Sequence, residues 1–131
     1  MKRKYFKERK QSFVYAFSGL YYMLKKEPNA LVHMVLMLIA FAFGIVLKIS
    51  KTEWCILAMA SAMVVASEAF NSAIELLVDL TTTNYNEKAR RAKDLAAGAV
   101  LIAAGAAAIA GIVIFLPKIV DLAGLFFKLQ G

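Results

Sequence analysis

Three long apolar stretches constrain most strongly what this chain can fold into. They cover residues 29–47, 54–79 and 95–116; the first holds one ionisable residue, His33, and the third holds none. As an α-helix, the first stretch would extend over about 28 Å, close to the thickness of the hydrocarbon core of a bilayer. We therefore predict an all-α membrane protein with three transmembrane helices at these positions.

The composition agrees with this prediction and excludes several other classes of protein. Hydrophobic residues make up 61% of the 131 residues, whereas an average soluble domain has about 45 to 50%. The formal net charge of +7 suits a membrane protein that faces anionic lipid or phosphate. The single cysteine, Cys55, cannot form an intrachain disulfide, and no cluster of Cys or His has the spacing of a zinc site. Residues 1–131 are short enough to form one domain.

The N-terminal residues 1–27 are predicted to form an amphipathic helix on the membrane surface. They combine many basic side chains with Phe6, Phe13 and Phe17 at roughly helical spacing. The positive-inside rule places this basic end in the cytoplasm.

The loops and the C-terminal tail fit the same orientation. The short polar loop 48–53 would lie outside, and the basic connection 87–94 would lie in the cytoplasm. Pro117 is expected to end the third transmembrane helix. Residues 117–131 would then form a short interfacial helix on the outer face.

The second apolar stretch carries a row of polar side chains. Glu68, Asn71, Glu75 and Asp79 are spaced by three, four and four residues, so they share one helical face. Measured from Trp54 along a helix, Glu68 lies about 21 Å and Glu75 about 32 Å away. The row therefore occupies the cytoplasmic third of the membrane and its boundary, where ionisable residues are costly and are by default suspected of function.

The outer half of this helix has no matching polar row. Before Ser67, its polar side chains after Trp54 are Cys55 and Ser61. These are too sparse to conduct protons or ions across the bilayer. The pattern weighs against a channel or a transporter.

Carboxylates this close repel one another unless a cation lies between them, and magnesium with oxygen ligands provides such a cation. Glu27 stands at the head of the first stretch, at the same depth, so Glu27 and Glu75 could share magnesium with nucleotide phosphates. Lys93, beside Asp94 near the start of the third helix, is well placed to contact phosphate. Together with the additional buried acid Glu68, these groups suit phosphoryl transfer.

The conventional nucleotide-binding motifs are absent from the sequence. No glycine is followed directly by lysine, so there is no P-loop, and no pair of glycines has the spacing of a dinucleotide-binding loop. A kinase built from this chain would therefore differ from the soluble nucleotide-binding folds.

Two segments resemble a known family. Residues 68–75, Glu-Ala-Phe-Asn-Ser-Ala-Ile-Glu, followed by Val78-Asp79, and residues 92–100, Ala-Lys-Asp-Leu-Ala-Ala-Gly-Ala-Val, are closely similar to the two signature segments of the small bacterial integral-membrane lipid kinases. This is the diacylglycerol kinase and undecaprenol kinase family. The resemblance covers nearly the whole chain, including the surface helix and the order of the three transmembrane helices.

The resemblance implies a homotrimer, a bundle of helices whose active sites are shared between neighbouring subunits. It implies an enzyme of the bacterial cytoplasmic (inner) membrane that uses ATP and Mg²⁺ to phosphorylate the hydroxyl of a membrane lipid alcohol. Its partners would be ATP, the lipid alcohol and the bilayer, with no nucleic acid among them.

The resemblance also implies roles for individual residues. Glu68 matches the proposed general base, Asn71 a polar active-site residue, and Asp79 an acid on the same face. Catalysis would involve Glu68, Asn71 and Lys93.

The nucleotide and its metal would be bound by a second group of residues. Glu27 and Glu75 match the acids that hold the metal, and both would also contact the nucleotide. Lys93 and Asp94 match a pair that engages the nucleotide, and Arg9 is the nearest match to a basic contact on the surface helix.

Several alternatives stay open at this point. The carboxylates could be structural or ion-binding groups in a non-enzymatic membrane subunit or a small transporter. For a kinase, the lipid could be undecaprenol or diacylglycerol; the loop at 49–54 and the tail after Pro117 look more like the undecaprenol-using branch. His33 is interpreted as a packing or hydrogen-bonding residue and is left out of the site.

Overall fold

The computed structural model describes residues 2–82 and 84–130, except for the side chains of residues 2–5, 7, 125–127, 129 and 130. It forms four helices, α1 (Lys2–Lys26), α2 (Pro28–Val46), α3 (Lys51–Thr81) and α4 (Glu87–Gln130), and no strand within the described residues. Helices α2, α3 and α4 are each long and apolar enough to cross a membrane. The predicted all-α fold with three spanning helices is confirmed, and the trimer stays a prediction. Met1, the first residue of the predicted surface helix, and Gly131, the last residue of the predicted tail, lie outside the described residues.

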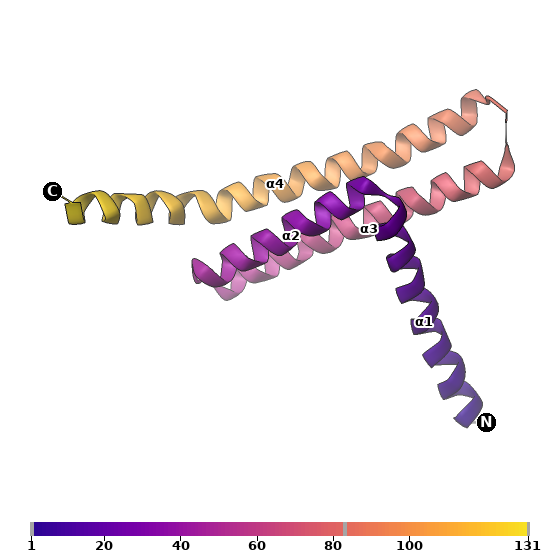
Figure 1. Ribbon diagram of the computed structural model, residues 1–131, viewed down its shortest axis with the longest axis horizontal. Coiled ribbons are helices and arrows are strands. Elements are labelled where there is room, and N and C mark those ends of the chain that lie inside the picture. Colours follow the sequence, from indigo (N-terminus) through magenta and orange to yellow (C-terminus); the bar gives the residue numbers. More distant parts are fainter. Residues whose placement is uncertain (1, 83, 131) are drawn as a thin grey trace.

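The chain turns sharply between α1 and α2, at Glu27. A proline disfavours helical backbone at the residue before it, and Glu27 accordingly has an extended backbone, with φ −104° and ψ 104°. Pro28 then begins α2, at a position where its missing N–H group costs nothing. As a result, α1 leaves the bundle at a steep angle while α2, α3 and α4 run alongside one another (Figure 1). This arrangement suits one helix on a membrane surface and three helices that cross it.

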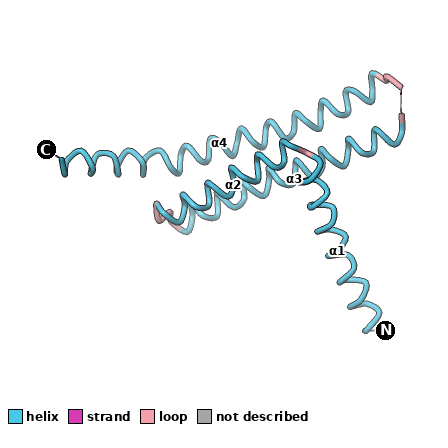
Figure 2. Tube along the Cα trace, viewed as in Figure 1, coloured by secondary structure: helices cyan, strands magenta, loops and turns pink. Residues whose placement is uncertain are grey.

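A short loop joins α2 to α3, as the tube in Figure 2 shows. Lys48 in this loop has a left-handed backbone, with φ 51°, which helps the chain to reverse direction. Ser50 caps α3: its Oγ accepts a hydrogen bond from the Glu53 N–H at 3.3 Å, and the Glu53 carboxylate accepts one from the Ser50 N–H at 2.6 Å. Because of this capping box, α3 starts at Lys51. The predicted start at Trp54 is therefore three residues too late.

Helix α4 extends beyond the predicted third transmembrane helix. We predicted an end at Leu116, but α4 continues through Pro117 to Gln130. Proline removes one backbone hydrogen bond and usually ends or kinks a helix, but here the helix continues on both sides of it. Just after the proline, Lys118 Nζ lies 3.2 Å from Glu53 Oε1 and links α4 to the start of α3. The placement of the tail at the outer interface stays a prediction.

Helices α3 and α4 pack closely over much of their length. Ala96 and Ala103 on α4 are buried, and small side chains at such positions let two helices approach each other. In contrast, a Cβ atom added to Gly98, Gly105 or Gly111 would meet no atom within 4 Å. Within one chain, it is therefore alanines, rather than glycines, that lie in the close contact.

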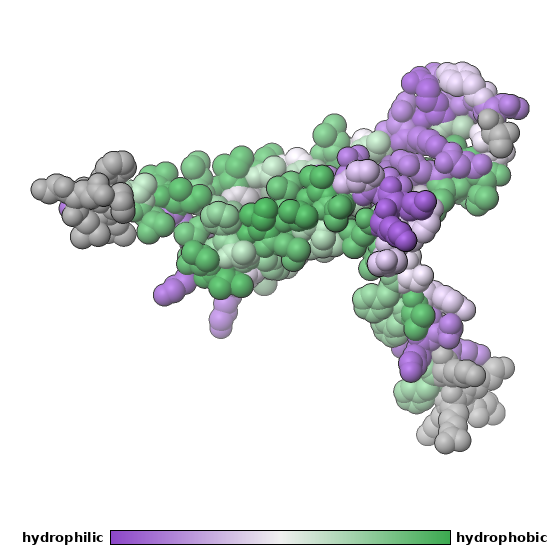
Figure 3. Space-filling view, in the orientation of Figure 1, coloured by the Kyte–Doolittle hydropathy of each residue, from purple (hydrophilic) through white to green (hydrophobic). Residues whose placement is uncertain are grey.

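The two ends of the bundle have different buried side chains. Ile49, Leu57 and Ile114 form a small apolar core near the loop between α2 and α3. The buried polar side chains belong to the opposite end of α3. Figure 3 shows hydrophobic colour along the bundle and hydrophilic colour gathered where α1 joins it and around the connection from α3 to α4. Many large apolar side chains are exposed in the single chain, so they are available to lipid or to other chains.

Candidate functional site

The site begins with buried polar side chains on α3. Glu68, Asn71 and Ser72 are 3%, 9% and 5% exposed, and burying such groups is costly unless they are hydrogen-bonded. Asn71 Nδ2 donates a hydrogen bond to Glu75 Oε1 at 3.0 Å. However, Glu68 Oε1, Asn71 Oδ1 and Ser72 Oγ have no hydrogen-bond partner within the described part of the chain. Unsatisfied buried groups of this kind require an explanation, and a ligand is one.

Helix α2 brings a histidine to this carboxylate. His33 Nε2 lies 3.4 Å from Glu68 Oε1. This is within ion-pairing distance but is not a hydrogen bond, so the Glu68 oxygen has no hydrogen-bond partner within the described residues. From the sequence alone, His33 is interpreted as a packing or hydrogen-bonding residue outside the site. One available signal was that it is the only ionisable side chain in the first apolar stretch.

Two further carboxylates lie near Glu68. Glu27 and Glu75 are both close enough to interact with it electrostatically. Glu27 is half-buried, and although it occupies the N-cap position of α2, its side chain makes no capping hydrogen bond. The three carboxylates predicted to hold the metal and to act as the general base thus interact electrostatically with one another through Glu68.

Helix α4 contributes a lysine to the same region. Lys93 Nζ lies 2.5 Å from Asp79 Oδ1 on α3 and is also close enough to Glu75 to interact with it electrostatically. We refer to these residues together as the polar site, which comprises Glu27, His33, Glu68, Asn71, Glu75, Asp79 and Lys93.

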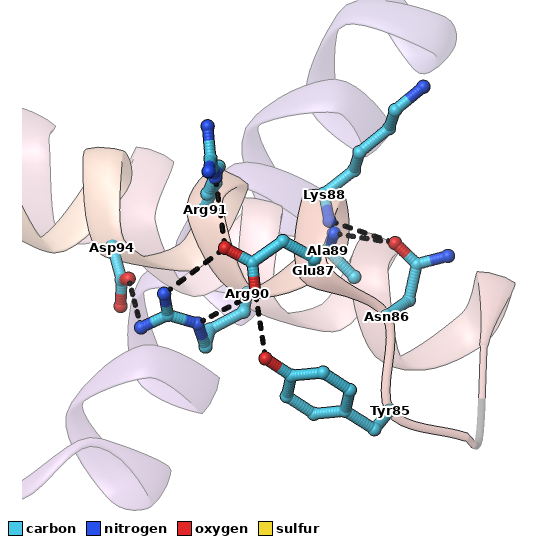
Figure 4. A network of polar contacts seen from close by, with 8 residues as sticks. All are labelled: Tyr85, Asn86, Glu87, Lys88, Ala89, Arg90, Arg91 and Asp94. Atoms are coloured by element: carbon cyan, nitrogen blue, oxygen red, sulfur yellow. Dashed lines mark hydrogen bonds and ion pairs between the residues drawn. The ribbon is translucent and has the colours of Figure 1, made fainter.

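Asp94 points to a different face of α4. Its Oδ2 lies 3.2 Å from Arg90 Nη1, and Figure 4 shows that Arg90 belongs to a network at the start of the helix. In this network Glu87 Oε1 also accepts a hydrogen bond from Arg91 Nε at 3.0 Å. Consecutive residues of an α-helix point about 100° apart. Within one chain, Lys93 joins the polar site and Asp94 does not.

Arg9 is also separated from the polar site within the chain. It is exposed and lies 17 residues before Lys26, the last residue of α1. This separation corresponds to about 26 Å along the helix, and α1 points away from the bundle (Figure 1). The role of Arg9 in nucleotide binding stays a prediction that would require a neighbouring subunit.

An apolar groove of about 560 Å³ begins at His33 and is lined by α2, α3 and α4. Its lining includes Met37, Val65 and Ala107, and His33 and Ser61 are the polar side chains among the lining residues. Such a surface suits hydrocarbon, whether from a lipid chain or from another helix.

The donor set of the polar site fits magnesium carried by a nucleotide. Within residues 2–82 and 84–130, no three His, Cys, Asp or Glu side chains converge as a complete metal site. Magnesium bound with a nucleotide commonly takes only one or two protein carboxylates, because phosphate and water supply the other oxygens. Glu27 and Glu75 provide such oxygens, and the hydrogen bond from Asn71 orients the Glu75 carboxylate.

The fold and the site define an α-helical membrane protein with a carboxylate-lined polar site at one end of its spanning helices. Comparison with known sequences makes this class more specific. The profile of the prokaryotic diacylglycerol kinases matches residues 14–115, and the chain belongs to this family.

Two named relatives extend over most of the chain. The undecaprenol kinase of Bacillus subtilis (strain 168) is 36% identical over 109 residues, which cover 83% of this chain and 89% of that protein. The diacylglycerol kinase of Synechocystis sp. (strain ATCC 27184 / PCC 6803 / Kazusa) is 38% identical over 112 residues, covering 85% of this chain but only 64% of that protein. These relatives support a lipid kinase and confirm the family predicted from the two signature segments.

Proposed function

We propose that this protein transfers the γ-phosphate of ATP, with magnesium, to the hydroxyl of a membrane lipid alcohol, either undecaprenol or diacylglycerol. The observation that carries this proposal is the buried Glu68, which has an unsatisfied oxygen and lies near Glu27 and Glu75. A lysine at the same site, Lys93, adds a cation suited to phosphate. The names of the two relatives support the class of acceptor.

Glu68 is proposed to act as the general base. Its carboxylate would accept the proton of the lipid hydroxyl while the hydroxyl oxygen bonds to the γ-phosphorus and ADP leaves. Asn71 would keep the neighbouring Glu75 carboxylate in place through its side-chain hydrogen bond.

Glu27 and Glu75 are proposed to hold magnesium together with the nucleotide phosphates. Magnesium would neutralise phosphate charge when bound. Lys93 would leave Asp79 to contact the phosphates and stabilise negative charge on the transferring group. Asp94, and Arg9 of a neighbouring chain, are proposed to bind other parts of the nucleotide.

We propose that the polar site lies at the cytoplasmic face of the bacterial inner membrane and that the N-terminus is cytoplasmic. Basic residues near α1 and at the start of α4 support this orientation. The protein is proposed to be a homotrimer with sites shared between subunits. The many apolar side chains exposed in one chain are compatible with such an assembly.

The test is transfer of labelled γ-phosphate from ATP to undecaprenol and to diacylglycerol, measured side by side in mixed micelles. We expect magnesium-dependent labelling of one lipid, and a loss of about 10²- to 10⁴-fold for Glu68→Gln. Glu53→Gln is a matched control, because Glu53 lies on the same helix at the opposite end and a glutamine preserves the capping box. It should keep the activity of the unmodified protein.

Absence of labelling on both lipids, with folded protein and magnesium present, would refute the kinase proposal. The polar site would then be explained better by a non-enzymatic membrane subunit or a small transporter with structural or ion-binding carboxylates. The Glu68→Gln result distinguishes a catalytic from a structural role of Glu68. If the role were purely structural, the substitution would lower stability and leave the rate per folded molecule unchanged.

A further inference from the structure

His33 lies between two features of the site. On one side its Nε2 atom is 3.4 Å from Glu68 Oε1. On the other it belongs to the lining of the apolar groove that extends between α2, α3 and α4. Its side chain is 26% exposed, against 4% for that of Glu68. A group that bridges from the apolar groove to a buried carboxylate can influence how a lipid hydroxyl meets that carboxylate.

Glu68 requires a partner of this kind. A carboxylate can act as a base only if one of its oxygens is aimed at the proton to be removed, and small errors in aim are costly in rate. Asn71, on the same face, directs its amide to Glu75, and Glu68 Oε1 has no hydrogen-bond donor within the described residues. His33 is the side chain within ion-pairing distance of this oxygen.

We propose that His33 is a positioning residue for Glu68. Its Nε2–H group donates a hydrogen bond to Glu68 Oε1 and fixes the carboxylate, so that the second oxygen faces the lipid hydroxyl at the end of the groove. The separation of 3.4 Å shortens when substrate binds, as is common for catalytic hydrogen bonds that are long in the absence of substrate. This inference rests on the proposed kinase function.

A purely structural role for His33 makes a different prediction. A polar side chain in one membrane helix can hydrogen-bond to another and hold the two helices together. Losing such a contact between α2 and α3 lowers stability and leaves the rate per folded molecule unchanged. Losing a positioning contact lowers kcat and leaves the KM for ATP unchanged.

The experiment compares three variants of the full chain in the same mixed micelles. His33→Gln places an amide N–H near the position of Nε2, His33→Asn is polar but too short to reach it, and His33→Leu removes the donor. For each variant we would measure kcat, the KM for ATP, the KM for the lipid and thermal unfolding. For His33→Leu and His33→Asn we expect kcat to fall about 10- to 100-fold, the usual cost of losing a supporting contact. His33→Gln should keep most of the activity.

The double variant His33→Leu/Glu68→Gln tests whether the two residues act as a unit. Because such residues are strongly non-additive, it should be no slower than Glu68→Gln alone. Equal kcat for His33→Gln and His33→Asn, or a twofold or smaller change in kcat for His33→Leu, would overturn the proposal. If the unmodified chain phosphorylates neither lipid, the kinase function itself fails, which is a separate result from an active enzyme that is indifferent to His33.

Discussion

Lys93 and Asp79 raise the question of whether a close ion pair is structural or functional. Their atoms are 2.5 Å apart, yet the side chains are 36% and 65% exposed. Exposed ion pairs contribute little to stability, because water and salt screen them. The ion pair therefore contributes little to stability, and the proposed function assigns Lys93 a separate role, in which phosphate oxygens replace the Asp79 carboxylate.

We predict that Lys93→Met lowers kcat about 100-fold, because it removes a cation that acts on the transferring phosphate. Asp79→Asn, which breaks the same ion pair but retains the lysine, should lower kcat much less. Both variants should unfold at the same temperature as the unmodified chain. Steady-state phosphate transfer and thermal unfolding in the same detergent provide the comparison, and equal kinetic losses in the two variants would contradict a separate role for Lys93.

The site residues on α3 were predictable from their spacing, whereas Glu27 and Lys93 were assigned from their places in the chain and from the family resemblance. Glu68, Asn71 and Glu75 follow from helical spacing, because residues three and four apart lie on one face. The contact between His33 and Glu68 was not predictable in this way. It depends on how far α2 is rotated and shifted against α3, and nothing in the local spacing specifies that relation.

At the scale of the elements, the loop between α2 and α3 is held by close packing around Gly44. A Cβ atom at Gly44 would lie 2.9 Å from Trp54 Cη2 and 3.1 Å from Ile49 Cδ1. The ring of Trp54 also packs against Phe41, with 5.5 Å between ring centroids. Any larger residue at Gly44 must displace these side chains.

We predict that Gly44→Ala destabilises the protein by about 1 to 3 kcal/mol, the typical cost of overpacking. Gly124→Ala is the matched control, since a Cβ atom there meets nothing within 4 Å. Alanine favours a helix over glycine by about 0.5 to 1 kcal/mol, so the control should be neutral or slightly stabilising. Unfolding by heat or denaturant in detergent measures both, and an unchanged stability for Gly44→Ala would show that Trp54 moves aside freely.

The helices themselves were largely predictable, and their ends were less so. Long apolar stretches indicate membrane helices because the backbone must satisfy its own hydrogen bonds in lipid. Pro117 does not end α4, although proline usually marks such an end. The start of α3 at Lys51 depends on the reciprocal hydrogen bonds of Ser50 and Glu53, and the spacing of these two residues in the sequence is that of a capping box.

At the scale of the whole molecule, one chain leaves much apolar surface uncovered and keeps Arg9 far from the polar site. Helix α1 points away from the bundle (Figure 1), so Arg9 can approach a polar site only in another subunit. Closed rings of identical chains commonly bring such separated surfaces together.

If sites are shared, two inactive variants should restore activity when they are mixed. We predict that Arg9→Ala and Glu68→Gln are each strongly impaired and that an equal mixture, unfolded together and refolded, regains about a quarter of the activity. Each of the two required residues is then intact in half of the sites, independently of the other. The restored activity is measured as phosphate transfer by the refolded mixture, and the separately refolded variants are the control. No gain on mixing would contradict a site shared between subunits.

The sequence by itself determined that this chain forms three membrane helices and that one of them carries a polar face, because hydrophobic length and helical periodicity are local properties of the chain. Only the tertiary structure decided that His33 meets Glu68, that Lys93 pairs with Asp79 and that Asp94 pairs with Arg90. These outcomes depend on the rotation and offset of neighbouring helices. Packing along their whole lengths sets both quantities, so no single segment of the sequence specifies them.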